Sequence, residues 1–134
     1  MLPGDYIAFK LTGEIATTIN GLSEGMLWDF KEKKVANWLL KHYGIDPDLT
    51  PPLVNNFENQ GKVTDEGAAQ SGLPKGIPIR YRAGDQPNNA LALNILKPGE
   101  VAATGGTSGV LFAISDRNSY KEFYRVNQDR KSVV

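Results

Sequence analysis

Asp85 is the first residue whose position suggests chemistry. It follows the run from Ile77 to Arg82, which predicts a strand, and precedes Gln86-Pro87, which predicts the start of a helix. In open α/β sheets, ligands bind in the crevice at the carboxyl ends of the strands. A helix dipole favours the ionised carboxylate there, and that carboxylate can accept a proton from a substrate hydroxyl. On position alone a simple helix N-cap is the commoner role for an Asp in this place, and the two roles are compatible.

A glycine-rich segment, Gly105 to Gly109, is the second candidate. Glycines let a ligand approach the backbone closely, and successive N–H groups in a turn can form a nest that binds phosphate. Thr107 and Ser108 add hydroxyl groups to this segment. The same residues predict a simple β-hairpin turn equally well. The segment lacks the lysine of the standard phosphate-binding loop, so it is not that motif.

The other residue types narrow the chemistry. The chain has no cysteine, which excludes disulfides, thiolate metal sites and a cysteine nucleophile. Its one histidine, His42, lies on a predicted helix. A packed or surface role suits it better than a ligand role, because one imidazole does not make a metal site. We therefore predict no metal site within the chain itself.

Composition sets the general class of the protein. The 134 residues include fifteen basic and fifteen acidic side chains, a balance that disfavours nucleic-acid binding. The longest apolar run, Val110 to Ile114, is far shorter than the ~18 residues of a membrane span, and no signal peptide opens the chain. We expect a cytoplasmic protein that binds neither nucleic acid nor membrane. The length predicts one domain or one piece of a larger one.

The elements that position the candidate residues alternate between helices and strands. Four helices are predicted: Tyr6 to Leu11 with Asp5 as cap, Val35 to Tyr43, a helix between Thr64 and Gly72, and Gln86 to Pro98. Two β-rich runs follow, Glu100 to Thr104 and Val110 to Ser115. The stretch from Glu14 to Gly25 predicts a loop or a ligand-facing surface. This succession predicts an α/β fold.

Four short motifs occur in an order that resembles FGGY-family carbohydrate kinases. Leu2-Pro3-Gly4-Asp5-Tyr6 and Lys10-Leu11-Thr12-Gly13 resemble the "LP-x-DY…LTG" stretch of that family. The segment from Gly72 to Ile79 resembles its "GLP-x-GTPV" strand. Gly84-Asp85-Gln86 matches "GDQ", and Gly106 to Gly109 matches the "GTSG" of the xylulokinase branch. Each motif is weak alone, but the ordered set is specific and covers most of residues 1–115.

The resemblance implies both a fold and an activity. The fold would be part of a ribonuclease-H-like (actin-like ATPase) domain, with a mixed sheet and flanking helices. The activity would be transfer of the γ-phosphoryl group of ATP to a pentulose such as D-xylulose, with Mg²⁺ neutralising charge. Asp85 would be the catalytic base and would contact the sugar with Gln86. The residues implied to contact nucleotide phosphates are Gly106, Thr107, Ser108 and Gly109.

The resemblance also implies an internal fragment. Residues 1–115 would belong to the N-terminal, sugar-side domain, and residues 116–134 would begin the crossing to a second domain or form a disordered tail. Phosphoryl transfer depends on positioning and electrostatic clamping from several parts of an enzyme. We therefore expect no kinase turnover from the isolated chain. Unpartnered sheet edges and apolar faces would favour its self-association.

Two departures from the family pattern lie beside Asp85. Tyr81-Arg82-Ala83-Gly84 is bulkier than the usual glycine-rich triplet, and Pro87-Asn88-Asn89 replaces small residues. Both bear on substrate preference. The alternatives are a kinase of the same family that acts on ribulose, glycerol or gluconate, and a non-catalytic binding domain. In the latter, Gly105 to Gly109 would be only a hairpin turn.

Overall fold

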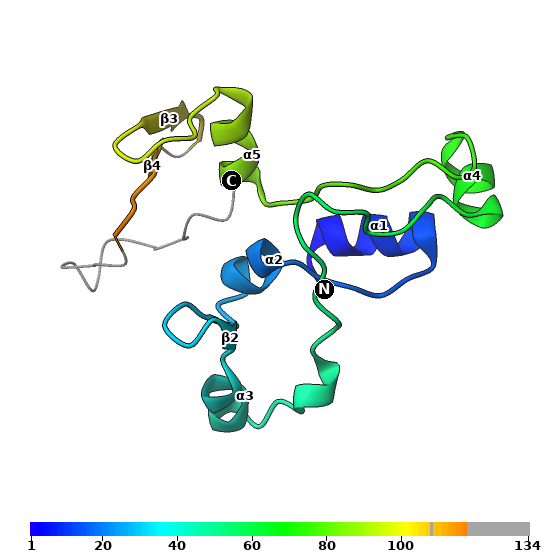
Figure 1. Ribbon diagram of the computed structural model, residues 1–134, viewed down its shortest axis with the longest axis horizontal. Helices are drawn as coiled ribbons and strands as arrows, with labels where there is room; N and C mark the ends of the chain where they lie inside the picture. The colour runs from blue at the N-terminus through cyan, green and yellow to red at the C-terminus, as the bar shows by residue number, and fades with distance from the viewer. Residues whose placement is uncertain (108, 118–134) are drawn as a thin grey trace. The chain divides into compact units, whose positions relative to one another are not determined.

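The computed structural model describes residues 1–107 and 109–117 of the chain (Figure 1). It contains two compact units, Met1–Ala83 and Gly84–Val134. The elements of the first unit are α1 (Pro3–Thr12), α2 (Ile19–Glu24), β1 (Trp28–Asp29), β2 (Lys34–Val35), α3 (Asn37–Tyr43), the 3₁₀-helix η1 (Pro47–Leu49) and α4 (Asp65–Ser71). Those of the second unit are α5 (Asp85–Ala92), β3 (Val101–Gly105) and β4 (Gly109–Ala113).

Helix α1 confirms the first predicted helix but corrects the role of Asp5. The N-cap is Leu2, and Pro3 is the first helical residue, where its fixed φ suits the helix and its missing N–H costs nothing. Asp5 therefore lies inside the first turn and is buried rather than capping. At the other end Gly13 adopts the left-handed conformation (φ 75°), and its N–H bonds to the carbonyl of Phe9.

The stretch predicted as a loop, Glu14 to Gly25, contains the short helix α2, so that prediction is wrong in part. Thr18 is its N-cap and accepts a hydrogen bond from the N–H of Gly21 at 3.1 Å. Asn20 and Leu22 are its buried residues. Six residues make fewer than two turns, so no apolar period develops that the sequence could reveal.

Helices α3 and α4 confirm two further predictions. Both end at a left-handed glycine, Gly44 and Gly72. Thr64 caps α4 as predicted and accepts a hydrogen bond from the N–H of Gly67 at 3.1 Å. Helix α4 packs against α1, and the Thr64 N–H also bonds to the carbonyl of Leu11 at 3.0 Å. A Cβ added at the buried Gly67 would collide with the Leu11 carbonyl, so this contact between helices requires glycine.

Substitution of Gly67 by alanine should destabilise the chain. Glycine to alanine in a helix interior normally stabilises by up to ~1 kcal/mol. Here the added methyl group meets backbone that cannot move aside, and overpacking of this kind costs ~1–3 kcal/mol. Gly4→Ala in α1 is the matched control, because its Cβ would make only an ordinary 3.8 Å contact with Arg82 Cβ. Thermal melts of both variants test this, and a Gly67→Ala protein as stable as the parent would contradict it.

The sheets are small. β1 pairs antiparallel with β2, and β3 pairs antiparallel with β4 from Val101↔Ala113 to Gly105↔Gly109. The run from Ile77 to Arg82 forms no continuous strand, and only Pro78 bridges, antiparallel, to Lys62. The backbone hydrogen bonds beside this bridge are made by Ile77 and Ile79 with residues 60–63, so the missing N–H of Pro78 costs nothing here. The predicted α/β class is confirmed, while the mixed sheet appears in the described residues as two hairpins and isolated bridges.

The buried apolar side chains are few and mostly small. Leu22, Leu40 and Val63 are the larger ones of the first unit, and Ala90, Ala102 and Ile114 are buried in the second. Large apolar side chains that are exposed include Tyr6, Trp38, Leu49 and Leu111. Within the part of the chain that the structure describes, no helix is long and apolar enough to cross a membrane.

Candidate functional site

Asp85 is the first residue of α5 and is exposed to solvent. The N-cap is Gly84, so the prediction that Asp85 caps the helix is wrong by one position. Its Oδ1 accepts a hydrogen bond from the N–H of Gln86 at 2.8 Å, and its Oδ2 lies 3.5 Å from Nε2 of the same residue. The carboxylate thus lies in the first turn, where the helix dipole stabilises negative charge, and stays open to a ligand.

Helix α5 is shorter than predicted. It ends at Ala92 with Leu93 as C-cap, and Asn94 then adopts a positive φ of 57°, so the chain leaves the helix well before Pro98. Glu100 organises the segment that follows by accepting hydrogen bonds from the N–H groups of Lys97 and Leu96. These two bonds, that from Lys97 first, lower the pKa of Glu100 below its ordinary value.

The glycine-rich segment closes the β3–β4 hairpin. Gly105 pairs with Gly109, which confirms the hairpin turn and the two predicted strands to within two residues. Gly106 and Thr107 are exposed in the turn, while Ser108 lies outside the described residues. A Cβ added at Gly105 or Gly109 would meet no atom within 4 Å. Backbone N–H groups at such a turn are accessible to a ligand.

Both candidate segments, α5 with Asp85 and the β3–β4 hairpin, belong to the second unit. Helix α5 contacts β3 (Figure 1) and buries Pro87 and Ala90, while Ala102 of β3 is also buried. Asp85 is exposed at the amino end of this packed helix. His42, by contrast, belongs to the first unit, where it is exposed and contacts Tyr43 edge to face at 4.9 Å. Of the two non-ligand roles expected for His42, packed or surface, the structure shows the surface one.

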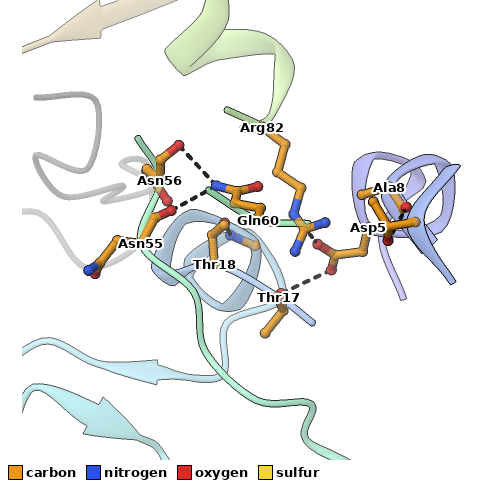
Figure 2. Close-up of polar contacts among 10 residues, drawn as sticks. Asp5, Ala8, Thr17, Thr18, Asn55, Asn56, Gln60 and Arg82 are labelled. Atoms are coloured by element: carbon orange, nitrogen blue, oxygen red, sulfur yellow. Dashed lines mark hydrogen bonds and ion pairs between the residues drawn. The ribbon is translucent and has the colours of Figure 1, made fainter. Parts of the chain in front are cut away.

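The first unit contains a buried polar cluster of Asp5, Thr17 and Arg82 that the sequence did not predict. Figure 2 shows the Arg82 guanidinium reaching the carboxylate of Asp5, with Nε 3.2 Å from Oδ1. On the other side, the Thr17 hydroxyl donates a hydrogen bond to Asp5 Oδ2 at 2.9 Å. The side chains of Asp5 and Arg82 are only 9% and 8% exposed. The one signal in the sequence is Arg82, a charged residue among those that replace the family's glycine-rich triplet.

The neighbouring Tyr81 also packs within the first unit. Its ring stacks on Phe57, with centroids 5.0 Å apart and ring planes 17° from parallel. Burial raises the pKa of the Tyr81 hydroxyl above its ordinary value, so the group stays neutral at physiological pH. Nearby, the Gln60 side chain donates hydrogen bonds to the carbonyls of Asn55 and Asn56 at 2.7 and 3.0 Å (Figure 2).

The fold and these motifs define a class of protein. Residues 1–92 match the N-terminal domain of the FGGY family of carbohydrate kinases, and the chain belongs to this family. Its members are phosphotransferases that use ATP. The chain is similar to the crystal structure of xylulose kinase from Rhodospirillum rubrum, with a TM-score of 0.77 and 35% identity over 84% of this chain and 24% of that one. It therefore has the α/β fold of the actin-like sugar kinases.

The relatives found by sequence are named kinases of two kinds. The xylulose kinase of Bacillus subtilis is 29% identical over 116 residues, which are 87% of this chain and 23% of that protein. The autoinducer-2 kinase of Enterobacter sp. is 35% identical over 104 residues, which are 77% of this chain and 19% of that protein. The chain thus spans about a fifth to a quarter of the length of the curated relatives it matches.

Proposed function

We propose that this chain is the part of an ATP-dependent sugar kinase that supplies the catalytic base, and that the acceptor is a pentulose such as D-xylulose. The exposed Asp85 carboxylate at the amino end of α5 carries this proposal, because it lies in the Gly-Asp-Gln motif and its helix packs on the Gly-Thr-Ser-Gly hairpin. The names of the relatives support xylulose as the acceptor.

In the proposed reaction, Asp85 accepts the proton of a sugar hydroxyl while that oxygen bonds to the γ-phosphorus and the bond between γ-phosphorus and the ADP oxygen breaks. ATP supplies the transferred phosphoryl group. The Gln86 amide contacts the sugar. Phosphate oxygens would accept hydrogen bonds from the backbone N–H groups of the turn, Gly106 to Gly109. The hydroxyl groups of Thr107 and Ser108 would donate further hydrogen bonds.

Mg²⁺ would neutralise the phosphate charge in this reaction, as it does in phosphoryl transfer generally. Among residues 1–107 and 109–117, no three His, Cys, Asp or Glu side chains gather into a metal site. We derive no step through Mg²⁺, which in phosphoryl-transfer sites is typically held by one or two carboxylates together with the substrate phosphates.

A substrate panel on the full-length enzyme tests the acceptor. We expect the highest kcat/KM with D-xylulose, compared with ribulose, glycerol, gluconate and autoinducer-2, when ADP release is followed. The isolated 134-residue chain should show no turnover, because the clamping groups of the wider enzyme are missing. A preference for another acceptor would replace the substrate. Failure of the full-length protein to phosphorylate any of them would favour the non-catalytic binding domain.

Three further expectations belong to this proposal. We place the kinase in the cytoplasm, with sugar and ATP as its ligands and with neither nucleic acid nor membrane as a partner. The exposed large apolar side chains support self-association of the isolated chain. Residues 1–115 would be part of the sugar-side domain; most of the proposed crossing or tail, residues 118–134, lies outside the described residues.

A further inference from the structure

The two bulky residues that precede the Gly-Asp-Gln motif are both anchored in the first unit. Tyr81 and Arg82 stand four and three positions before Asp85. The Tyr81 ring stacks on Phe57, and the Arg82 guanidinium pairs with Asp5 of α1. The chain leading to Asp85 is therefore held by side-chain contacts at two successive residues.

The Arg82 contact joins three parts of the first unit. Asp5 comes from α1, Thr17 from the segment before α2, and Arg82 from the segment before α5. The surroundings are tight, because a Cβ added at Gly21 would lie 2.7 Å from Thr17 Oγ1 and 3.6 Å from Asp5 Oδ2. The amino-terminal turn of α2 thus closes against the Asp5–Thr17 hydrogen bond and leaves little room for the carboxylate to move.

A buried ion pair of this kind is better suited to fixing a geometry than to adding stability. Removing both charges from water costs about as much as their attraction returns, while alternative positions of either partner leave a charge unpaired. Asp5 is the only ionic partner of Arg82 in the described part of the chain. Residue 82 therefore has one favourable placement, whereas a glycine there would leave the backbone free to adopt several.

We propose that Arg82 is a positioning residue for phosphoryl transfer, because its ion pair with Asp5 anchors the segment that carries Asp85. The proposal rests on the proposed function of Asp85 as the base. In this proposal Arg82 acts through the backbone that it holds and not by contact with the substrate. A displacement of ~1 Å at a reacting group can cost ~10²-fold in rate, so loss of the anchor should appear in kcat.

The test compares three variants of the full-length kinase. Arg82→Met keeps the length of the side chain but removes the charge, and Arg82→Lys restores a charge that can reach Asp5. Lys75→Met is the matched control, because it breaks the exposed Lys75–Asp65 ion pair, whose side chains are 64% and 82% exposed. We expect kcat to fall ~10–100-fold in Arg82→Met with KM for ATP unchanged, to recover in part in Arg82→Lys, and to be unaffected in Lys75→Met.

Hydrogen exchange separates this positioning role from a general loss of structure. In Arg82→Met, amide exchange should accelerate in the segment around residues 81–88 and stay unchanged in α3, at a temperature where the variant is folded. A folded Arg82→Met enzyme with parental kcat and parental exchange would overturn the proposal. An inactive parent enzyme would instead overturn the proposed kinase function, and the two failures are thereby distinguished.

Discussion

Replacing Asp85 by asparagine in the full-length enzyme should remove nearly all phosphorylation of D-xylulose and leave the protein folded. Asparagine has the same shape, but its amide cannot take the hydroxyl proton. General base catalysis contributes ~10²–10⁴-fold to a rate, so we expect kcat to fall by that factor. The fold should tolerate the change because Asp85 is exposed and its one short hydrogen bond, from the Gln86 N–H, can be made equally by the asparagine oxygen.

Asp65→Asn is the matched control for this experiment. Asp65 is also the first residue of a helix and is exposed, so both substitutions remove one charge from a first helical turn. The dipole effect of such a charge is only ~0.3–1 kcal/mol, and it should be alike in the two variants. Coupled measurement of ADP release gives the rates, and circular dichroism checks the fold. Near-parental turnover in Asp85→Asn would end the assignment of Asp85 as the base.

Local sequence patterns predicted the elements that have local causes. Helix α4 has its capping Thr64 and its terminating Gly72 within nine consecutive residues, so its limits could be predicted from the sequence. The β3–β4 hairpin likewise follows from a glycine-rich turn between two apolar runs. The end of α5 could not be predicted in this way, because Asn94 in a left-handed conformation gives a weaker signal than a glycine.

The same distinction applies to the candidate site. Asp85 and the Gly106 to Gly109 segment could be singled out as candidates because each lies in a short contiguous motif, and their roles stay predictions. The roles of Asp5 and Arg82 could not, because their contact joins the two ends of the first unit. The local sequence predicts Asp5 as a helix cap and Arg82 as a departure that affects substrate preference. Only the fold shows that the two charges neutralise each other.

Removing one partner of the Asp5–Arg82 ion pair should destabilise the first unit more than either Gly67→Ala or Asp65→Asn. Asp5→Asn leaves the Arg82 guanidinium buried without an opposite charge, and breaking a buried pair in this way costs ~3–5 kcal/mol. Asp65→Asn, which breaks the exposed pair with Lys75, should cost at most ~1 kcal/mol. Both tryptophans, Trp28 and Trp38, lie in the first unit, so their fluorescence during urea unfolding reports on this unit.

A double-mutant cycle separates the ion pair from the burial of each residue. Asp5→Asn combined with Arg82→Met removes both charges, and the buried site then holds no unpaired ion. The double variant should therefore be more stable than the sum of the two single losses predicts, by ~1–3 kcal/mol. High salt should not change this coupling, because screening acts mainly on exposed charges. Additive losses, or an Asp5→Asn protein that unfolds at the parental urea concentration, would show that the pair does not anchor Arg82.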